Sequence, residues 1–324
     1  MRVLFAREQF NRGIPWSELA PLLPGWVIET CQRERIAEAA AEVDVVCPFG
    51  ARVDRETISS SRFGLIQQFG AGLDGVDLEA ATESGVWVAR LPGDLTGNAD
   101  SVAELAIHHV LSLLRRVDDA RTGLREGRWG QPVGRSLSEA TVLVVGLGSV
   151  GEAVVARLRA FGPRIRAVRA HPQREAPEGV DRVVGASQLG DVIAEADVIV
   201  GCATLDAASR GLFSAEVLAR VRPGSVFVNV ARGGLVDEDA LLAALDDGRL
   251  AGAGLDVFAT EPADPHGPLV THPRVVATPH VAGLTETMFR RSGELFAQNL
   301  QQWAAGQTPA WAANAPSKPI RRPD

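Results

Sequence analysis

Short apolar runs alternate with amphipathic segments along the first third of the chain. The runs are RVLFA, WVIET, DVVCPF, LIQQFG and VWVARL, and helical segments such as RERIAEAAAE lie between them. Continuous apolar runs of this length are typical of strands buried on both faces, and helical connections suit right-handed crossovers. Residues 1–97 are therefore predicted to form one open parallel sheet.

A long helix and a second alternating series follow. Apolar residues recur at helical spacing over residues 102–117, with Asn98 as the candidate N-cap. From Thr141 onward, the runs TVLVVG, RIRAVRA, DVIVGCA, SVFVNVA, AGAGLDV and RVVATPH predict a second sheet, and a last helix over about 285–305 can pack on the first half. The fold class is α/β, with two doubly wound parallel-sheet domains of Rossmann-like or flavodoxin-like type.

Composition narrows the class of protein. The chain has 324 residues, of which 46% are apolar and 23% charged, and this suits two globular domains. A net charge of -7 without a basic face gives no reason to expect nucleic acid, and neither a bilayer-spanning run nor a signal-peptide pattern is visible. Cys31, Cys47 and Cys202 are scattered, so they are expected to be unpaired in a reducing cytoplasm.

A glycine triad lies between the first strand and first helix of the second series. Gly146 permits a sharp turn, Gly148 lets backbone approach a pyrophosphate, and Gly151 allows close packing of helix on strand. Free amides at the helix start would then face the phosphates. A purely structural turn is the alternative, and the strand before and helix after the triad favour a dinucleotide site.

The next strand ends in VRAHPQR, where NAD-selective sites carry an acidic residue. Arg169 occupies that position, and His171 and Arg174 follow it. Loss of the acid removes repulsion of a 2'-phosphate, and the cations supply charge-assisted partners. NADP is therefore the predicted cofactor, with stacking of Arg169 on adenine and use of NAD as the alternative.

Three reactive side chains each follow a predicted strand, where open α/β sheets build their sites: Arg232, Glu261 and His280. Singly, they can be a carbonyl cap, a surface glutamate and a satisfied loop histidine. Together they supply a cation for a carboxylate, a proton donor and a carboxylate that orients the donor. Four further histidines are expected to be packing or surface residues: His108, His109, His266 and His272. No metal-ligand set is visible.

Several motifs occur in the order found in the D-isomer-specific 2-hydroxyacid dehydrogenase family: GLGSVG, NVARGGLVDEDALLAAL, GAGLDVF followed by EP, and TPHVAG. The sequence resembles this family from about Leu65 to the last helix, and is most similar to glyoxylate or hydroxypyruvate reductases and general 2-ketoacid reductases. The first sixty residues match in pattern alone.

The resemblance implies a role for each matched residue. Arg232 would bind the carboxylate of a small anionic 2-keto acid through its planar fork. His280 would protonate the ketone oxygen as hydride arrives, and Glu261 would stabilise the imidazolium. A substrate loop of small residues would hold the carboxylate, although a turn would need small residues anyway: Ala71, Gly72 and Leu73.

The resemblance also implies the cofactor contacts, the domains and the assembly. The predicted NAD(P) contacts are Gly146, Gly148, Ser149, Val150, Gly151, Arg169, His171, Arg174, Thr204, Ala231 and Asp256, the last on the nicotinamide amide. Residues 1–97 plus 286–324 would form the substrate domain and 98–285 the cofactor domain, with a cleft between them that closes over the substrate. A homodimer is expected. Arg90 is either a surface ion-pair residue or a contact for a second anionic group on the substrate.

Two other functions stay open. The first is oxidation of another small anion such as phosphite, although the related phosphite enzymes carry a lysine where FGAGLDG has small and apolar residues. The second is a nucleotide-sensing interaction protein, since a corepressor group shares this fold and these residues. Turnover of glyoxylate or hydroxypyruvate at ordinary rates would exclude a pure sensor.

Overall fold

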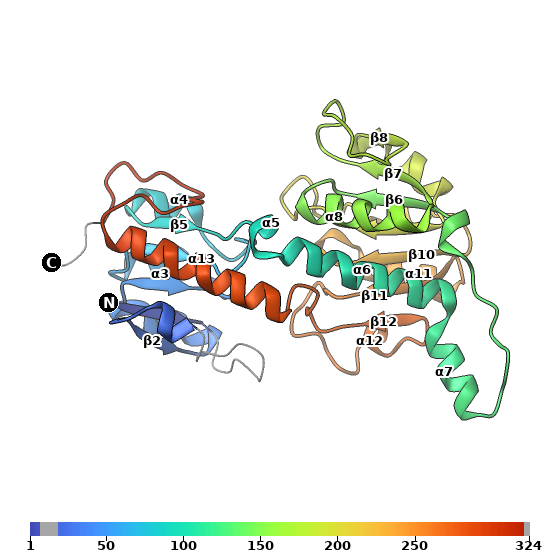
Figure 1. Cartoon of the computed structure of the whole chain (residues 1–324), viewed down its shortest axis with the longest axis horizontal. Coiled ribbons are helices and arrows are strands. Elements are labelled where there is room, and N and C mark those ends of the chain that lie inside the picture. Colours follow the sequence, from blue (N-terminus) through green and yellow to red (C-terminus); the bar gives the residue numbers. More distant parts are fainter. Residues whose placement is uncertain (7–18, 321–324) are drawn as a thin grey trace. The chain divides into compact units, whose positions relative to one another are not determined.

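The chain folds into two compact units, described over residues 1–6 and 19–320 of the computed structural model (Figure 1). Unit 1 comprises Met1–Asn98 and Leu284–Asp324, and unit 2 comprises Ala99–Gly283. Each unit has its own parallel sheet with helices on both faces, so the predicted fold class is confirmed.

The sheet of unit 1 has the strand order β2-β1-β3-β4-β5, and each strand pairs with its neighbours in parallel. This is the flavodoxin-like order, in which crossover helices cover both faces. The strands are β1 (Arg2–Phe5), β2 (Val27–Thr30), β3 (Val45–Cys47), β4 (Leu65–Gln67) and β5 (Trp87–Ala89). The α-helices are α2 (Ile36–Ala39), α3 (Arg55–Ser59), α4 (Leu78–Glu83), α5 (Gly93–Thr96) and α13 (Glu286–Ala304).

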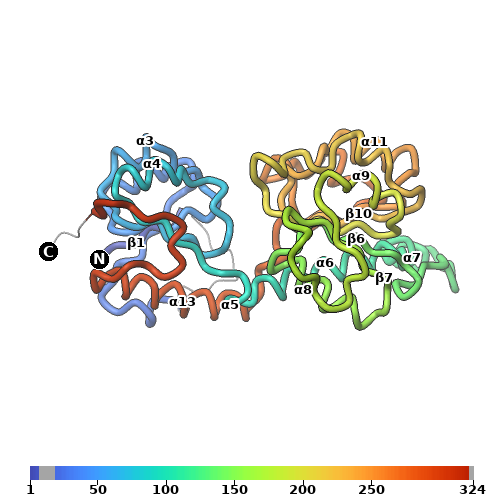
Figure 2. The backbone as a smooth tube through the Cα atoms, turned by 90° about the horizontal axis from the view of Figure 1, so that it is seen from above, coloured from blue at the N-terminus to red at the C-terminus, as the bar shows by residue number. Residues whose placement is uncertain are grey.

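Separate apolar clusters lie on the two faces of this sheet. Figure 2 shows α3 and α4 on one face of unit 1 and α13 on the other. Ile58 and Ala80 pack in the first cluster, and Phe296 and Leu300 of α13 pack in the second. Thr285 caps α13 by accepting a hydrogen bond from the backbone N–H of Met288 (3.2 Å), so the helix begins one residue after the sequence analysis places it.

The sheet of unit 2 has the order β12-β11-β10-β9-β6-β7-β8, again parallel. This is a Rossmann order extended by one strand, and its order reverses between β6 and β9. The strands are β6 (Thr141–Val145), β7 (Arg164–Val168), β8 (Arg182–Val184), β9 (Val198–Gly201), β10 (Ser225–Asn229), β11 (Leu250–Leu255) and β12 (Val275–Ala277).

Helices cover both faces of this second sheet. One buried cluster joins it to α6 and α8, and another joins it to α9, α10 and α11. The α-helices are α6 (Asn98–Arg115), α7 (Val117–Arg125), α8 (Ser149–Leu158), α9 (Leu189–Val192), α10 (Ala215–Leu218), α11 (Glu238–Asp246) and α12 (Pro268–Thr271). In such sheets, ligands bind outside the carboxyl ends of the strands, near the reversal of strand order.

Three local expectations need correction. Strand β8 was not predicted, because it is a three-residue edge strand after the polar, proline-containing segment 171–181. Asn98 is the first residue of α6 rather than its N-cap, and its N–H donates to the Thr96 hydroxyl (3.3 Å). The helix predicted over 102–117 is interrupted at Arg116, whose left-handed backbone (φ 51°) separates α6 from α7.

None of the three cysteines forms a disulfide, and Cys31 and Cys47 are buried. Among residues 1–6 and 19–320, no helix is both long enough and apolar enough to cross a membrane.

Candidate active site

The glycine turn joins β6 to α8. Gly146 has a φ of 104°, and a Cβ there would lie 2.5 Å from the backbone nitrogen of Ala203. A Cβ on Gly151 would lie 1.9 Å from the carbonyl oxygen of Gly146, so both positions require glycine. Gly148 faces open space and precedes α8 without a side-chain cap. The turn therefore fits a dinucleotide pyrophosphate, which would meet the unsatisfied amides of the first turn of α8.

Three adjacent strands carry the predicted catalytic side chains at one edge of the sheet. Arg232 follows β10, Glu261 follows β11, and His280 follows β12. The first two loops approach closely, because a Cβ on Gly233 would lie 1.9 Å from the carbonyl carbon of Phe258. The structure thus brings the segments of all three residues together within unit 2.

His280 and Glu261 form a direct pair. The His280 Nδ1 lies 2.7 Å from the Glu261 Oε2, and the other oxygen of Glu261 accepts the backbone N–H of Phe258 (3.1 Å). Burial raises the pKa of Glu261, but the hydrogen bond and charge of His280, the Phe258 N–H and the charge of Arg232 outweigh burial and lower that pKa below its ordinary value. Glu261 is therefore an ionised acceptor that leaves the His280 Nε2 for another partner.

Arg232 is half-buried at the end of the β10 segment. Its Nη1 donates to the carbonyl of Ala231 (2.7 Å), and its own carbonyl accepts the side-chain N–H of Asn229 (3.0 Å). The Asn229 side chain also accepts the N–H of Ala231 (3.1 Å). Asn229 thus fixes the backbone from which the guanidinium projects.

Asp256 holds the turn that carries His280. Its carbonyl accepts the N–H of His280 (2.8 Å), and its carboxylate accepts the N–H groups of Val281 (2.9 Å) and Ala282 (2.9 Å). His280 has a φ of 53°, a left-handed conformation that is costly for a residue with a Cβ. Asp256 is fully buried, so the structure gives it this backbone role alongside the predicted nicotinamide contact, which stays a prediction.

In unit 1, the predicted substrate residues lie after neighbouring strands. Residues 70–73 follow β4 and Arg90 follows β5. The Arg90 Nη1 donates to the carbonyl of Ala71 (3.4 Å), and the Gln68 side chain donates to the carbonyl of Gly72 (2.9 Å). Ala71 and Arg90 are exposed, whereas Gly72 and Leu73 are half-buried.

The predicted 2'-phosphate residues lie after β7. The Nη2 of Arg169 donates to the carbonyl of Arg174 and to that of Glu175 (3.0 Å). The Nε of Arg169 is buried and has no partner among the described residues. The side chains of His171 and Arg174 are exposed. Of the remaining predicted cofactor contacts, Ser149 and Thr204 are exposed, and Val150 and Ala231 are half-buried.

The sequence analysis expected His109 to be a packing or surface residue, and it did not single out Thr278, which is half-buried. His109 of α6 is fully buried, and its Nε2 lies 3.2 Å from the hydroxyl of Thr278, two residues before His280. The available signal was a histidine in the apolar stripe of a helix, together with Gly254 in AGAGLD: a Cβ at Gly254 would lie 2.7 Å from that of His109. No group of metal-ligating side chains occurs in the described part of the chain.

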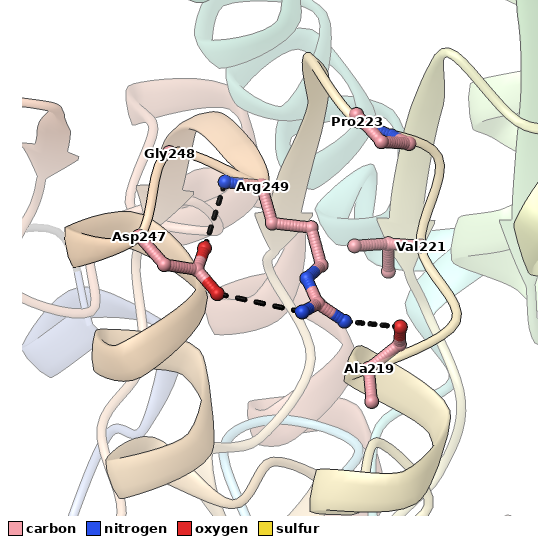
Figure 3. A pocket seen from close by; sticks show the side chains of 6 residues that line it. All are labelled: Ala219, Val221, Pro223, Asp247, Gly248 and Arg249. Atoms are coloured by element: carbon pink, nitrogen blue, oxygen red, sulfur yellow. Dashed lines mark hydrogen bonds and ion pairs between the residues drawn. The ribbon is translucent and has the colours of Figure 1, made fainter.

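An open depression of about 460 Å³ lies at the opposite, amino-terminal edge of the unit 2 sheet. Figure 3 shows that its charged groups satisfy one another: Arg249 pairs with Asp247 (3.5 Å) and donates to the carbonyl of Ala219. The charge of Arg249 is therefore already paired within the depression. None of the predicted site residues lines it.

Residues 107–282 match the NAD binding domain of the D-isomer specific 2-hydroxyacid dehydrogenases. The chain belongs to this family. D-3-phosphoglycerate dehydrogenase of Mycobacterium tuberculosis is 37% identical over 281 residues, covering 85% of this chain and 52% of that protein. The chain thus spans about half the length of the phosphoglycerate dehydrogenases it matches.

Relatives of similar length are also found. A glyoxylate reductase of Thermococcus onnurineus is 31% identical over 304 residues, covering 90% of this chain and 89% of that protein. An NADPH-dependent glyoxylate/hydroxypyruvate reductase of Sinorhizobium meliloti, solved with NADP and malonate, is 30% identical with a TM-score of 0.81, covering 100% and 99% of the two chains. An NAD-dependent formate dehydrogenase of Staphylococcus aureus, solved with NAD, is 25% identical with a TM-score of 0.86, covering 98% and 100%.

Proposed function

We propose that this protein reduces a small 2-keto acid of the glyoxylate or hydroxypyruvate type to the D-2-hydroxy acid, with NADPH preferred over NADH. The observation that carries the proposal is the 2.7 Å hydrogen bond between His280 and Glu261 beside the Arg232 segment. This set lies at the carboxyl edge of a sheet that also carries a dinucleotide turn, and such an edge is where open α/β sheets bind ligands.

Arg232, His280 and Glu261 each have a separate role in the proposed carbonyl reduction. A bound reduced nicotinamide supplies the hydride. Arg232 binds the substrate carboxylate through paired N–H donors and draws electron density from the adjacent carbonyl. The Nε2 of protonated His280 donates its proton to the ketone oxygen, while Nδ1 remains bonded to Glu261. In the reverse direction, the neutral imidazole removes the hydroxyl proton.

Preference for NADPH is supported by cations where NAD-selective sites carry an acid. The Arg169 guanidinium donates to the carbonyls of Arg174 and Glu175, which a phosphate could replace as acceptors, and His171 and Arg174 are exposed beside it. A 2'-phosphate would accept charge-assisted hydrogen bonds from such groups. The similar reductase of Sinorhizobium meliloti binds NADP, whereas the formate dehydrogenase of Staphylococcus aureus binds NAD.

A substrate panel tests the proposal. Glyoxylate, hydroxypyruvate, pyruvate and 3-phosphohydroxypyruvate are each assayed with NADPH and NADH, and formate and phosphite are assayed with the oxidised cofactors. We expect the highest kcat/KM for glyoxylate or hydroxypyruvate with NADPH. A highest value for 3-phosphohydroxypyruvate, formate or phosphite would replace the proposed substrate, and the absence of any turnover would reject the enzyme function.

We also propose that the loop 70–73 holds the substrate carboxylate and that Arg90 accepts a second anionic group. Arg90 is exposed beside this loop, with its guanidinium on the Ala71 carbonyl. Removal of Arg90 by Arg90→Ala should lower kcat/KM for dianionic keto acids about five-fold more than for monoanionic ones, as expected for one exposed charge pair. An equal loss for both classes would leave Arg90 without this role.

A homodimer in a reducing compartment is the proposed state. Large apolar side chains are exposed on α7 and the segment after it: Leu124 (61%), Trp129 (87%) and Val133 (87%). Figure 1 shows α7 and this segment extending from the sheet of unit 2. Association would cover them, so light scattering should give a dimer mass for the wild type and a smaller mass for Trp129→Ser/Val133→Ser. A monomeric wild type would contradict the proposal.

A further inference from the structure

A chain of hydrogen bonds runs from α6 to the turn that carries His280. The Nε2 of His109 lies 3.2 Å from the Thr278 hydroxyl, which donates to the Asp256 Oδ1 at 2.6 Å. His109 and Asp256 are both fully buried. All these residues belong to unit 2, so the chain lies within one compact body.

The direction of each bond follows from the groups present. Thr278 has one hydroxyl proton, and it donates this proton to Asp256, whose oxygens also accept the N–H groups of Val281 and Ala282. His109 must therefore be the donor to Thr278, with its proton on Nε2. Burial and the neighbouring His108 lower the pKa of His109 to about 4, so the ring is neutral at neutral pH.

This arrangement costs stability. The Nδ1 of His109 is buried without a partner in the described part of the chain, and an unsatisfied buried polar atom lowers the stability of the fold. A leucine of similar size would avoid that cost. Strand β11 also accommodates the ring by having glycine at position 254, which makes room for the Cβ of His109. The glycine would be needed for a leucine as well, so the unsatisfied Nδ1 alone marks the cost of keeping a hydrogen-bond donor where an apolar side chain would pack more favourably.

The chain of hydrogen bonds ends at His280, whose backbone is strained. Asp256 accepts three consecutive N–H groups, from residues 280–282, and these bonds hold His280 at a φ of 53°. The Thr278 hydroxyl fixes the rotation of the Asp256 carboxylate, and His109 fixes the hydroxyl. A small rotation of the carboxylate would release the turn, and displacement of a reacting group by 1 Å can cost about a hundredfold in rate.

We propose that His109 is a positioning residue for His280, acting through Thr278 and Asp256. The proposal rests on the proposed function, in which His280 is the acid-base residue. His109 contacts neither substrate nor cofactor in this scheme. Its role is to fix the hydrogen-bond pattern of the turn on which the reacting imidazole lies.

The test measures kcat, KM and the dissociation constant of NADPH, using the best keto acid of the substrate panel. His109→Leu should lower kcat about tenfold, with KM and cofactor affinity within twofold of wild type. His109→Gln should recover most of the loss, because its side-chain N–H can replace the Nε2 donor. The matched control is His108→Leu on the exposed neighbouring position, for which wild-type kcat is expected.

Melting temperature and a double-mutant cycle separate positioning from general loss of structure. We expect His109→Leu to melt no lower than wild type, since it removes the unsatisfied Nδ1. Thr278→Val should also lose about tenfold in kcat, and the double variant should lose little more, because both remove the same chain. Losses that multiply, a wild-type kcat for His109→Leu, or no recovery with His109→Gln would overturn the proposal. His280→Ala distinguishes this failure from failure of the proposed function. If His280→Ala keeps wild-type turnover, the proposed acid-base role of His280 is wrong. If His280→Ala loses turnover, any of the three contrary results above rejects only the positioning role of His109.

Discussion

The two ends of the unit 2 sheet prepare their functional side chains to different degrees. At the β10–β12 end, His280 is bonded to Glu261, and its backbone is held by Asp256. At the β7–β8 end, Arg169 donates to backbone carbonyls of its own loop, and His171 and Arg174 are exposed. The β10–β12 end is held by internal hydrogen bonds, whereas the β7–β8 end would have to exchange internal or solvent partners in order to bind the proposed 2'-phosphate.

This difference predicts which kinetic constant each end controls. Preorganised groups act on the transition state, so changes at the β10–β12 end should appear mainly in kcat or in substrate recognition. Groups that gain partners on binding should control cofactor affinity.

His280→Ala should lower kcat by about a hundredfold or more, because it removes the proposed proton donor. The NADPH dissociation constant should stay within twofold of wild type, since the glycine turn and the Arg169 loop are untouched. Rapid-mix kinetics and fluorescence titration of NADPH measure the two quantities. His266→Ala, at an exposed histidine, is the control. Near-normal turnover of His280→Ala would assign the acid-base role to another group.

Arg232→Lys should raise KM for the keto acid about 30-fold, because a single ammonium replaces a planar fork with paired donors. Its kcat should fall less, as His280 and Glu261 remain in place. Arg222→Lys is a matched control, since Arg222 is bonded to Asp197 at the amino-terminal edge of the same sheet (2.7 Å). An unchanged KM would remove Arg232 from substrate binding.

Arg169→Asp should change the ratio of NADPH to NADH dissociation constants by about tenfold in favour of NADH, by removing a phosphate partner and adding repulsion. The kcat at saturating cofactor should change little, in contrast to His280→Ala. Arg164→Asp makes the same charge change at the exposed amino end of β7 and should leave the ratio unaltered. Equal affinities in the wild type, or an unchanged ratio in Arg169→Asp, would refute NADP selectivity.

The sequence predicted the strands and both sheets well because apolar runs report burial directly. It also placed Arg232, Glu261 and His280 after three strands, and the carboxyl ends of parallel strands lie at the same edge of a sheet. It could not reveal the His109–Thr278–Asp256 chain, because these residues are far apart along the chain and each has an ordinary role alone. The three-residue strand β8 was missed because so short an edge strand carries no periodicity.

Glu261→Gln should produce the smallest change, a shift of the pH profile rather than a loss of rate. In the proposed mechanism, reduction needs protonated His280, so the rate should be highest at low pH and should decline as pH rises. The pKa of Glu261 is lowered, so the carboxylate stays charged across the assay range and favours the imidazolium. A neutral amide removes that preference, and the midpoint of the decline should move down by about one pH unit.

Glu238→Gln is the control, because Glu238 accepts the Ala259 N–H (2.7 Å) in the same loop region and an amide oxygen can replace it. A midpoint that stays in place in Glu261→Gln would show that the 2.7 Å pair orients His280 without stabilising its charge.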